Sequence, residues 1–456
     1  MSGLLASSVL ADSLPSVLVF SRTTGFRHDC IETGAQAIQE IGEGVFTVEA
    51  TEDPAEFTPG NLSRFDAVVF LNTTGDVLDV SQQEAFEHYL RNGGGYVGIH
   101  GAADTENDWP FYGEILGGAW FKTHPAIQEA VVVVEDAHHP TTAHLPSRWV
   151  RTDEWYEYQD NPREHVHVLA SMDESTYQVA EGMGDHPIAW TVPVDQGAAF
   201  YTGGGHTHES FAEPAFREHL RQGIQWAIDD GWIELVPENG FAGWQGSEQW
   251  LDVDQVEMDP ENPQAFRVTS AMTGEPGGAN FVNGDGHVPN LRTAGTFGDV
   301  ELHVEFMVPE GSNSGVYLQE RYEIQILDSW GKPNPQHDDC GGVYQRWDDN
   351  RTPQGYEGRP PRVNASRKPG HWQSYDIIFR APKFDAEGNK IANARFEKVV
   401  HNGIVVHEDV ELTGHTRAGR AGPESATGPV MLQGDHGPVA YRNLKIRRIG
   451  PPPAGE

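Results

Sequence analysis

The chain has 456 residues, of which 38% are hydrophobic and 10% aromatic, and its formal net charge is −37. This length exceeds one ordinary core and indicates two domains of about 200 residues each, while the apolar content argues against disorder. The acidic balance excludes a nucleic-acid-binding surface, which needs clustered Lys and Arg, and no stretch reaches the roughly 18 apolar residues that cross a bilayer.

From residue 15 onward, short apolar strands alternate with longer amphipathic segments. Strands are predicted at 16–21, 45–50, 65–72 and 94–101, with later ones at 130–135, 165–170, 187–192 and 197–202. Helices are predicted at 29–42, 81–93 and 213–230, the second of them with Ser81 as N-cap and Glu84 completing a capping box. Because continuous β-branched runs suit a parallel sheet covered on both faces, residues 15–236 are predicted to form a doubly wound α/β domain.

After Gly231 the helical periodicity disappears. Short alternating strands follow between Gly, Pro and Asn turns, at 299–309, 314–319, 322–327, 374–382, 394–412 and 439–449. Asn402-Gly403 stands between two of them and is a strong hairpin signal. Residues 237–450 are therefore predicted to form an all-β sandwich or jelly roll, with the domain boundary near Pro237.

Cysteine usage and the N-terminus leave the cellular compartment open. Cys30 and Cys340 fall in different predicted domains, so no disulfide is expected, and two thiolates cannot make a zinc site. The apolar run at 4–11 has no basic residue before it and is interpreted as a ragged terminus or the remnant of a removed leader. A soluble bacterial or archaeal protein is expected, secreted or periplasmic if a leader was removed and cytoplasmic otherwise.

Polar side chains follow several strands of the first domain, where ligands of open α/β sheets bind. Each taken singly, these histidines could be ordinary structural residues, but together they predict a substrate-binding pocket at one sheet edge. The clustered histidines with Glu154 could bind a divalent metal ion, since imidazole and carboxylate are suitable ligands, although no HExxH-type spacing supports one and the ion is not identified. The predicted pocket residues are His28, His100, Asp104, His124, Glu154 and His206, with Asp153 and His208 beside them.

The ordered motifs GFRH, GGGYVGIHGAAD, GGAWFKTHP, DEWYEY, HPIAW and AFYTGGGHT resemble a ThuA-like (trehalose utilisation) domain. The resemblance implies a class I glutamine amidotransferase-like, flavodoxin-like fold and sugar-related work. In the amidotransferase relatives a nucleophilic cysteine occupies the strand-to-helix elbow, whereas this chain has His100 near that elbow. Since a glutaminase needs a thiolate, glutaminase chemistry is disfavoured.

In the second domain, SNSGVYLQERYEIQILDSWG (312–331) carries the most information. Along a strand Glu323 and Gln325 project to one face, and Asp328 joins them only if a bulge inserts a residue. The spacing is also that of the ExDxxE strand of retaining sandwich glucanases, with glutamine in place of the middle acid. Conventional glycoside hydrolysis by Glu323 and Asp328 is therefore one interpretation.

The wider set FAGWQG, FGDVELHVEFMVPEGSNSGVYLQERYEIQILDSWG, CGGVYQ, KPGHWQSYDIIFR, HNGIVV and GPVMLQGDHGPVAYRNLKIR resembles a 3-keto-disaccharide hydrolase domain. That resemblance implies a concanavalin-like sandwich that cleaves glycosides whose C3 hydroxyl is already a ketone. A base could then remove the C2 hydrogen, the enolate could expel the C1 substituent, and water could add.

The candidate roles in such a site follow from this chemistry. Glu323 or His436 could be the base, Tyr344 or Asp328 the acid, and Arg442 or a divalent cation the enolate stabiliser, with Gln325 beside them. Trp330, Trp347 and Trp372 could stack on sugar faces. The expected partner is a carbohydrate, and a separate sugar 3-dehydrogenase is expected to make the ketone. The alternative from another class is a non-catalytic carbohydrate-binding protein.

Overall fold

The computed structural model of the chain describes residues 14–236, 240–241, 243–269 and 280–450. It divides into two compact units, the first ending at Gly231 and the second beginning at Trp232. Pro237, where the sequence places the boundary, and the apolar run at 4–11 lie outside the described residues. Within the described residues no helix is long and apolar enough to span a bilayer.

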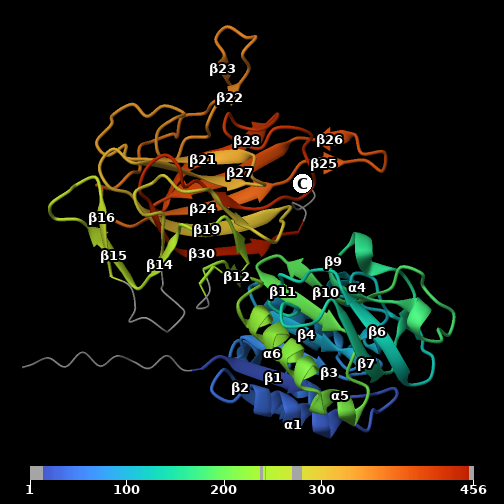
Figure 1. The fold of residues 1–456 in the computed structure, drawn as a ribbon. Helices are drawn as coiled ribbons and strands as arrows, with labels where there is room; N and C mark the ends of the chain where they lie inside the picture. The colour runs from blue at the N-terminus through green and yellow to red at the C-terminus, as the bar shows by residue number, and fades with distance from the viewer. Residues whose placement is uncertain (1–13, 237–239, 242, 270–279, 451–456) are drawn as a thin grey trace, which may run out of the picture. The chain divides into compact units, whose positions relative to one another are not determined.

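The first unit is built on a mixed sheet whose described strands run in the order β2-β1-β3-β4-β11-β10-β9-β6-β7 (Figure 1). These strands are β1 (Ser16–Phe20), β2 (Thr47–Thr51), β3 (Ala67–Leu71), β4 (Gly95–Ile99), β6 (Gln128–Val134), β7 (Arg148–Asp153), β9 (His167–Met172), β10 (Pro187–Val194) and β11 (Gly197–Thr202). Strands β5 (Phe121–Thr123) and β8 (Glu157–Tyr158) form a separate antiparallel pair. Pairing is parallel from β2 to β11 and antiparallel from β11 to β7. The parallel half has the flavodoxin-like order, which confirms the predicted fold class.

Helices cover this sheet because its central strands are apolar on both faces. All five residues of β3 and of β4 are buried. The helices are α1 (Ile31–Ile41), α2 (Pro59–Leu62), α3 (Val80–Arg91), α4 (Pro110–Ile115), α5 (His208–Ala212) and α6 (Pro214–Ile228). Helices α1, α5 and α6 pack on one another, as do α2 and α3. Helix α6 also packs on β4 and β11, the strands that carry the chain to the predicted pocket.

One local prediction in this unit was wrong, and one edge strand was missed. The N-cap of α3 is Asp79 rather than Ser81, and its capping box is completed by Gln82 rather than Glu84. Both residue sets fit the capping-box pattern, but Ser81 donates its hydroxyl hydrogen to Asp79 Oδ1 and lies inside the helix. The edge strand β7 was not predicted, although its residues alternate strictly between exposed and buried.

The second unit is an antiparallel sandwich. In its described residues one sheet runs β14-β17-β30-β19-β24-β27-β28, with β12 added beside β30, and the other runs β13-β18-β29-β20-β21. The first sheet contains β12 (Ile233–Glu234), β14 (Leu251–Val253), β17 (Asn280–Val282), β19 (Val300–Met307), β24 (Gln373–Arg380), β27 (Ala394–His401), β28 (Ile404–Leu412) and β30 (Ala440–Arg448). The second contains β13 (Trp244–Gln245), β18 (Leu291–Thr293), β20 (Asn313–Leu318), β21 (Tyr322–Leu327) and β29 (Met431–Leu432). Short pairs outside both sheets are β15 (Gln255–Met258) with β16 (Phe266–Thr269), β22 (Arg346–Trp347) with β23 (Gly355–Tyr356), and β25 (Lys383–Phe384) with β26 (Lys390–Ala392).

The inner faces of the two sheets form one core, which confirms the predicted sandwich. Strand β19 contributes alternate residues to it, among them Leu302, Val304 and Phe306, and β21 contributes Ile324 and Ile326. The predicted hairpin at Asn402-Gly403 joins β27 to β28, and both residues have positive φ, 53° and 79°. This is the geometry of a two-residue type I′ turn, so that prediction is confirmed. Cys30 and Cys340 are both buried free thiols.

The close approach of α6 to the sheet gives a first test of the fold. A Cβ atom on Gly95 would lie 2.5 Å from the backbone oxygen of Ala227. Gly95→Ala is therefore expected to lower the free energy of unfolding by about 1–3 kcal/mol, because helix and strand must separate. Gly60→Ala is the control, since its Cβ would meet nothing within 4 Å. Urea unfolding of both variants measures the difference, and equal midpoints would show that α6 does not pack against β4 in this way.

Candidate functional sites

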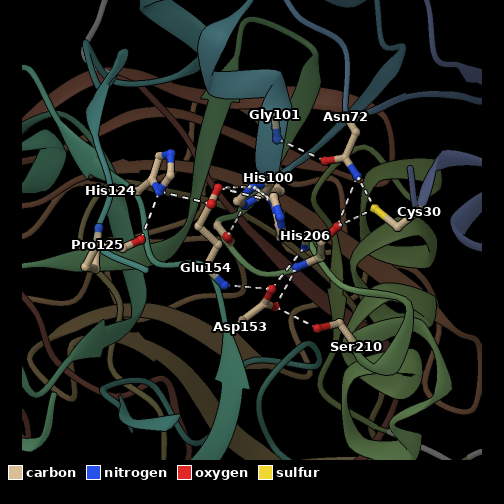
Figure 2. A network of polar contacts seen from close by, with 12 residues as sticks. Cys30, Asn72, His100, Gly101, His124, Pro125, Asp153, Glu154, His206 and Ser210 are labelled. Atoms are coloured by element: carbon tan, nitrogen blue, oxygen red, sulfur yellow. Dashed lines mark hydrogen bonds and ion pairs between the residues drawn. The ribbon is translucent and has the colours of Figure 1, made fainter. Parts of the chain in front are cut away.

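The first site lies where β4, β7 and β11 end, and Figure 2 shows its polar network. His100 directly follows β4 and takes a left-handed backbone conformation, with φ 44°. Its Nδ1 lies 2.8 Å from the carbonyl oxygen of Gly203, just after β11. Since a carbonyl only accepts, Nδ1 carries the hydrogen and donates it, and the Nε2 atom of the neutral ring keeps its lone pair.

Three side-chain atoms that could bind a metal ion lie close together here, and His100 Nε2 is one of them. His100 Nε2 lies 3.4 Å from Glu154 Oε2 and 3.2 Å from His206 Nδ1. His206 Nδ1 is itself 3.1 Å from Glu154 Oε2. His28 packs edge-on against both imidazoles, with ring centroids 5.1 Å from each. One ligand atom from each of His28, His100, Glu154 and His206 lies within 4.8 Å of the others, so these four residues could hold a metal ion.

Burial and mutual charge set the protonation of this cluster. Burial, together with His100 and His206, lowers the pKa of His28 to about 3. Burial would raise the pKa of Glu154, but the neighbouring His100 and His206 hold it well below its usual range. Burial lowers the pKa of His206, but the Glu154 carboxylate more than offsets this and leaves that pKa raised. The pocket thus holds a neutral His28 beside an ionised carboxylate.

The remaining predicted residues of this pocket lie at its edge. His124 is partly exposed, and its Nδ1 is 3.0 Å from Glu154 Oε1 and 2.9 Å from the Pro125 oxygen. Tyr156, which was not predicted, packs on His100 with ring centroids 4.0 Å apart. Asp104 is half-buried. Burial of Tyr156 is the main cause that raises the pKa of this tyrosine, and the charges of Glu154 and then Asp104 raise it further. The structure therefore brings together five of the six predicted residues and places Asp104 near the neighbouring tyrosine.

Asp153 positions the cluster without entering it. Its carboxylate is fully buried and accepts the backbone N–H groups of Gly205, Glu154 and His206 at 2.8, 3.0 and 3.1 Å. It also accepts the Ser210 hydroxyl at 2.8 Å and pairs with the buried Arg151 at 3.1 Å. Thus one side chain fixes both segments that deliver Glu154 and His206.

On the opposite side of the cluster, Asn72 performs a similar role that the sequence did not reveal. Its side-chain oxygen accepts the N–H of Gly101, and its nitrogen donates to the Gly205 oxygen at 3.0 Å. The nearby Cys30 is buried, and burial raises the pKa of its thiol to about 12. Burial therefore favours the protonated form of this thiol.

The second site lies on the outer face of β20 and β21. Glu323 pairs opposite Tyr317 and Gln325 opposite Gly315, while Ile324 and Ile326 point into the core. Glu323 and Gln325 are 3% exposed. A Cβ on Gly315 would lie 2.7 Å from Glu323 Oε1, so this glycine makes room for the carboxyl group.

A loop closes over these side chains. Tyr344 N–H donates to the Glu323 backbone oxygen, and Gln325 Nε2 donates to the Asp338 oxygen at 3.3 Å. Four buried polar atoms on this face have no hydrogen-bond partner among the described residues: Glu323 Oε2, Gln325 Oε1, Tyr317 Oη and His337 Nδ1. Unpaired buried polar atoms are unfavourable, so their grouping indicates a place where a polar ligand binds.

Burial raises the pKa of Glu323 to about 8, although the Tyr317 hydroxyl opposes part of this shift. Burial and the Glu323 charge also raise the pKa of Tyr344, while Arg417 lowers it. A carboxyl group that titrates near neutral pH in a polar pocket is a candidate general acid or base. Tyr317 and His337 were not predicted, because only the β20–β21 register and the covering loop bring them here.

The structure does not bring every predicted residue of this domain to Glu323. Asp328 lies beyond the end of β21, with no bulge in the β20–β21 register, and accepts the N–H groups of Gly311 and Trp330. His436 lies in an exposed turn, with its Nδ1 2.6 Å from Asp435 Oδ1. Burial and the Glu323 charge are the main causes that raise the pKa of Tyr317, and the Asp435 charge raises it further. Trp330 is 52% exposed.

The placement of Arg442 corrects an expectation about this pocket. Arg442 of β30 donates to Glu305 of β19 at 2.7 Å and stacks on Trp372 at 4.0 Å. Strands β30 and β19 belong to the sheet that does not contain Glu323. Strand alternation turns Arg442 and Glu305 outward, away from the shared core. Arg442 and Trp372 therefore lie across the sandwich from Glu323 and do not serve its pocket.

The Asp153 contacts give a test of the first site. Asp153→Ala removes the acceptor of three N–H groups and a partner of a buried guanidinium, so we expect a loss of about 3–5 kcal/mol of unfolding free energy. Glu52→Ala is the matched control, because its ion pair with Arg27 is exposed and Arg27 keeps Glu32. That variant should change stability by at most about 1 kcal/mol. Urea unfolding followed by circular dichroism measures both, and similar small losses would contradict the role of Asp153.

Two family models match the chain in succession. Residues 16–227 match the ThuA family, described as trehalose utilisation, and residues 231–447 match a 3-keto-alpha-glucoside-1,2-lyase-like domain. No curated protein sequence matches the chain.

Two similar solved structures each cover about half of this chain. A candidate ThuA-like protein from Bacteroides uniformis is 26% identical over 48% of this chain and 93% of its own, with a TM-score of 0.42. A candidate glycosyl hydrolase from Parabacteroides distasonis is 26% identical over 48% of this chain and 84% of its own, with a TM-score of 0.33. The family matches confirm both resemblances stated from the motifs and support a carbohydrate-processing role. The chain is a ThuA-family domain followed by a 3-keto-alpha-glucoside-1,2-lyase-like domain.

Proposed function

We propose that the second domain cleaves glycosides whose C3 hydroxyl has been oxidised to a ketone, with Glu323 as the base. The observation that carries this proposal is a single buried carboxyl group whose pKa is raised to about 8. It lies among polar atoms that have no partner within the described part of the chain. The description of the matching family model supports the same substrate class.

The reaction needs one strong base rather than two matched carboxylates. A C3 ketone acidifies the C2 hydrogen, and Glu323 takes that proton as the C2–H electron pair moves toward the ketone oxygen. The enolate then re-forms the ketone, a C1–C2 double bond forms, and the bond from C1 to the leaving oxygen breaks. Water adds afterwards across the double bond. A carboxylate in an apolar setting is a stronger base than one in water, which suits this first step.

Neighbouring groups suit the other parts of the reaction. Tyr317 Oη is a buried hydroxyl on the strand position opposite Glu323, and it is the proposed donor to the enolate oxygen. Tyr344, half-buried beside Glu323, is the proposed acid for the leaving oxygen. Gln325 Oε1 offers an acceptor for a sugar hydroxyl. His436, the alternative base, is in an exposed turn already bonded to Asp435.

Conventional hydrolysis by Glu323 and Asp328 is the less favoured function. Asp328 accepts backbone N–H groups of two turn residues and stands outside β21. A lectin-like binding role would be favoured by a shallow aromatic strip, whereas Glu323, Gln325 and Tyr317 are almost fully buried. On the proposed function, the substrate comes from a separate oxidation of a sugar C3 hydroxyl, and the first domain handles a related sugar.

The catalytic assignment is tested by Glu323→Gln, which keeps the shape and removes the base. We expect kcat/KM on a 3-keto glucoside to fall by roughly 10²- to 10⁴-fold with the fold unchanged. Asp328→Asn is the matched control and should stay within a few-fold of the wild type. Release of the aglycone is measured on 3-keto and unmodified glucosides. Wild-type activity in the Glu323→Gln variant, or equal cleavage of unmodified glucosides, would contradict the proposal.

The raised pKa of Glu323 predicts two pH dependences. The base must be ionised to act, so kcat/KM should rise with pH through about 8. For stability, the folded state binds the Glu323 proton up to about pH 8 while the unfolded chain releases it near its ordinary value of 4.5. This contribution is thus fully present below pH 4.5 and is lost as pH rises through about 8.

Glu323→Gln should remove the stability dependence. Compared with this variant, the wild type is expected to lose stability between about pH 5 and about pH 9, measured by urea midpoints. Parallel profiles for the two proteins would show that Glu323 titrates at its ordinary value.

A further inference from the structure

We propose that His28, His100, Glu154 and His206 of the first domain bind one divalent transition-metal ion. This site is distinct from the Glu323 pocket, and the inference does not depend on the function proposed for the second domain. No step of the glycoside cleavage uses these four residues.

The distances in the cluster fit a shared metal ion. An ion bound tetrahedrally at about 2.0–2.1 Å from nitrogen and oxygen ligands holds neighbouring ligand atoms about 3.3 Å apart. His100 Nε2, His206 Nδ1 and Glu154 Oε2 form a triangle with sides of 3.1, 3.2 and 3.4 Å. His28 supplies the fourth ligand atom, within 4.8 Å of the other three. The existing side-chain positions thus require little movement to surround an ion.

Hydrogen bonding alone does not satisfy these three atoms. The His100 hydrogen is on Nδ1, where it is donated to Gly203, so Nε2 presents a lone pair. Glu154 Oε2 is also an acceptor, and the only hydrogen between them would be one on His206 Nδ1. A cation at the centre of the triangle would satisfy all three lone pairs at once. His28 is 2% exposed, and its Nδ1 lacks a partner among the described residues.

Outer contacts hold the ligands as they do in metal centres. A backbone carbonyl fixes the tautomer and ring orientation of His100. The Asp153 carboxylate holds the backbone N–H groups of Glu154 and His206. This support shows a preformed arrangement rather than an accidental meeting of surface side chains.

The donor set selects the class of ion. Three imidazole nitrogens and one carboxylate oxygen suit Zn²⁺ and similar transition-metal ions, while Mg²⁺ and Ca²⁺ prefer oxygen ligands. Such an ion supplies Lewis-acid polarisation of a bound oxygen or acidifies a bound water. The His124 side chain is 41% exposed and contacts Glu154 at the edge of the cluster, so this side offers an entry for an oxygen ligand.

The test uses the full chain, stripped with a chelator and titrated with Zn²⁺. Calorimetry and elemental analysis should show one equivalent of Zn²⁺ per chain. His206→Ala and Glu154→Gln should weaken binding by at least about tenfold. His208→Ala is the matched control, because this imidazole is two residues from His206, at the start of α5, but is half exposed and bonded to Thr33. Glu323→Gln should also bind Zn²⁺ as the wild type does.

Co²⁺ gives a second reading that does not require any variant. The wild-type chain loaded with Co²⁺ should show the intense visible absorption of a four-coordinate nitrogen and oxygen site, displaced by added Zn²⁺. Circular dichroism of each variant shows that weaker binding is not unfolding. The proposal is overturned if the wild type binds no stoichiometric Zn²⁺, or if His206→Ala and Glu154→Gln bind it as tightly as His208→Ala. Either result would mean that the cluster is a hydrogen-bonded His–Glu network only.

Discussion

The buried carboxylate of Asp153 is the interaction on which the first site depends. A carboxylate is unfavourable in an apolar interior unless charge and hydrogen bonds compensate it. Asp153 obtains that compensation from Arg151, Ser210 and three backbone N–H groups. Two of these N–H groups belong to Glu154 and His206, the residues whose side chains meet His100. The need to satisfy one buried charge therefore fixes the geometry of the neighbouring site.

The second site differs from the first in how its buried polar atoms are bonded. There the buried polar atoms of Glu323, Gln325 and Tyr317 are left without partners among the described residues, on a strand face enclosed by the 337–344 loop. A protein core gains stability by pairing such atoms, so leaving them unpaired lowers stability. Natural proteins accept this loss at places where a ligand completes the hydrogen bonds. The satisfied bonds of Asp153 fix the backbone of the first site, whereas the second site is marked by buried polar atoms that lack partners among the described residues.

Much of the fold follows directly from the sequence, because buried runs and turn pairs act locally. The short, all-apolar and Val-rich segment 67–71 favours a covered strand, and Asn402-Gly403 readily adopts the two positive φ angles of its turn. Strand β7 was harder, because its exposed-and-buried alternation carries Arg and Trp rather than aliphatic residues. The His and Glu residues of the first site were found because strand ends of an α/β sheet converge.

The errors arose where the sequence does not say which sheet a strand joins. Arg442 and Glu323 both lie on strands with alternating patterns, but β30 and β21 belong to different sheets. Outward-facing residues of the two sheets of a sandwich lie on opposite sides of the molecule. Tyr317 and His337 were missed for the related reason that register and loop path depend on the assembled core.

Burial acts on both sites, but with different chemical consequences. It lowers the pKa of His28 to about 3 and raises that of Glu323 to about 8, and in each case it favours the neutral form. A neutral imidazole keeps a lone pair on one ring nitrogen without losing a proton. A neutral carboxyl group must first lose its proton to become a base. Once ionised, it is a stronger base than an exposed glutamate, and such basicity matches the weak acidity of a hydrogen next to a ketone. The same desolvation that makes the ionised form of Glu323 scarce at neutral pH therefore makes that form effective.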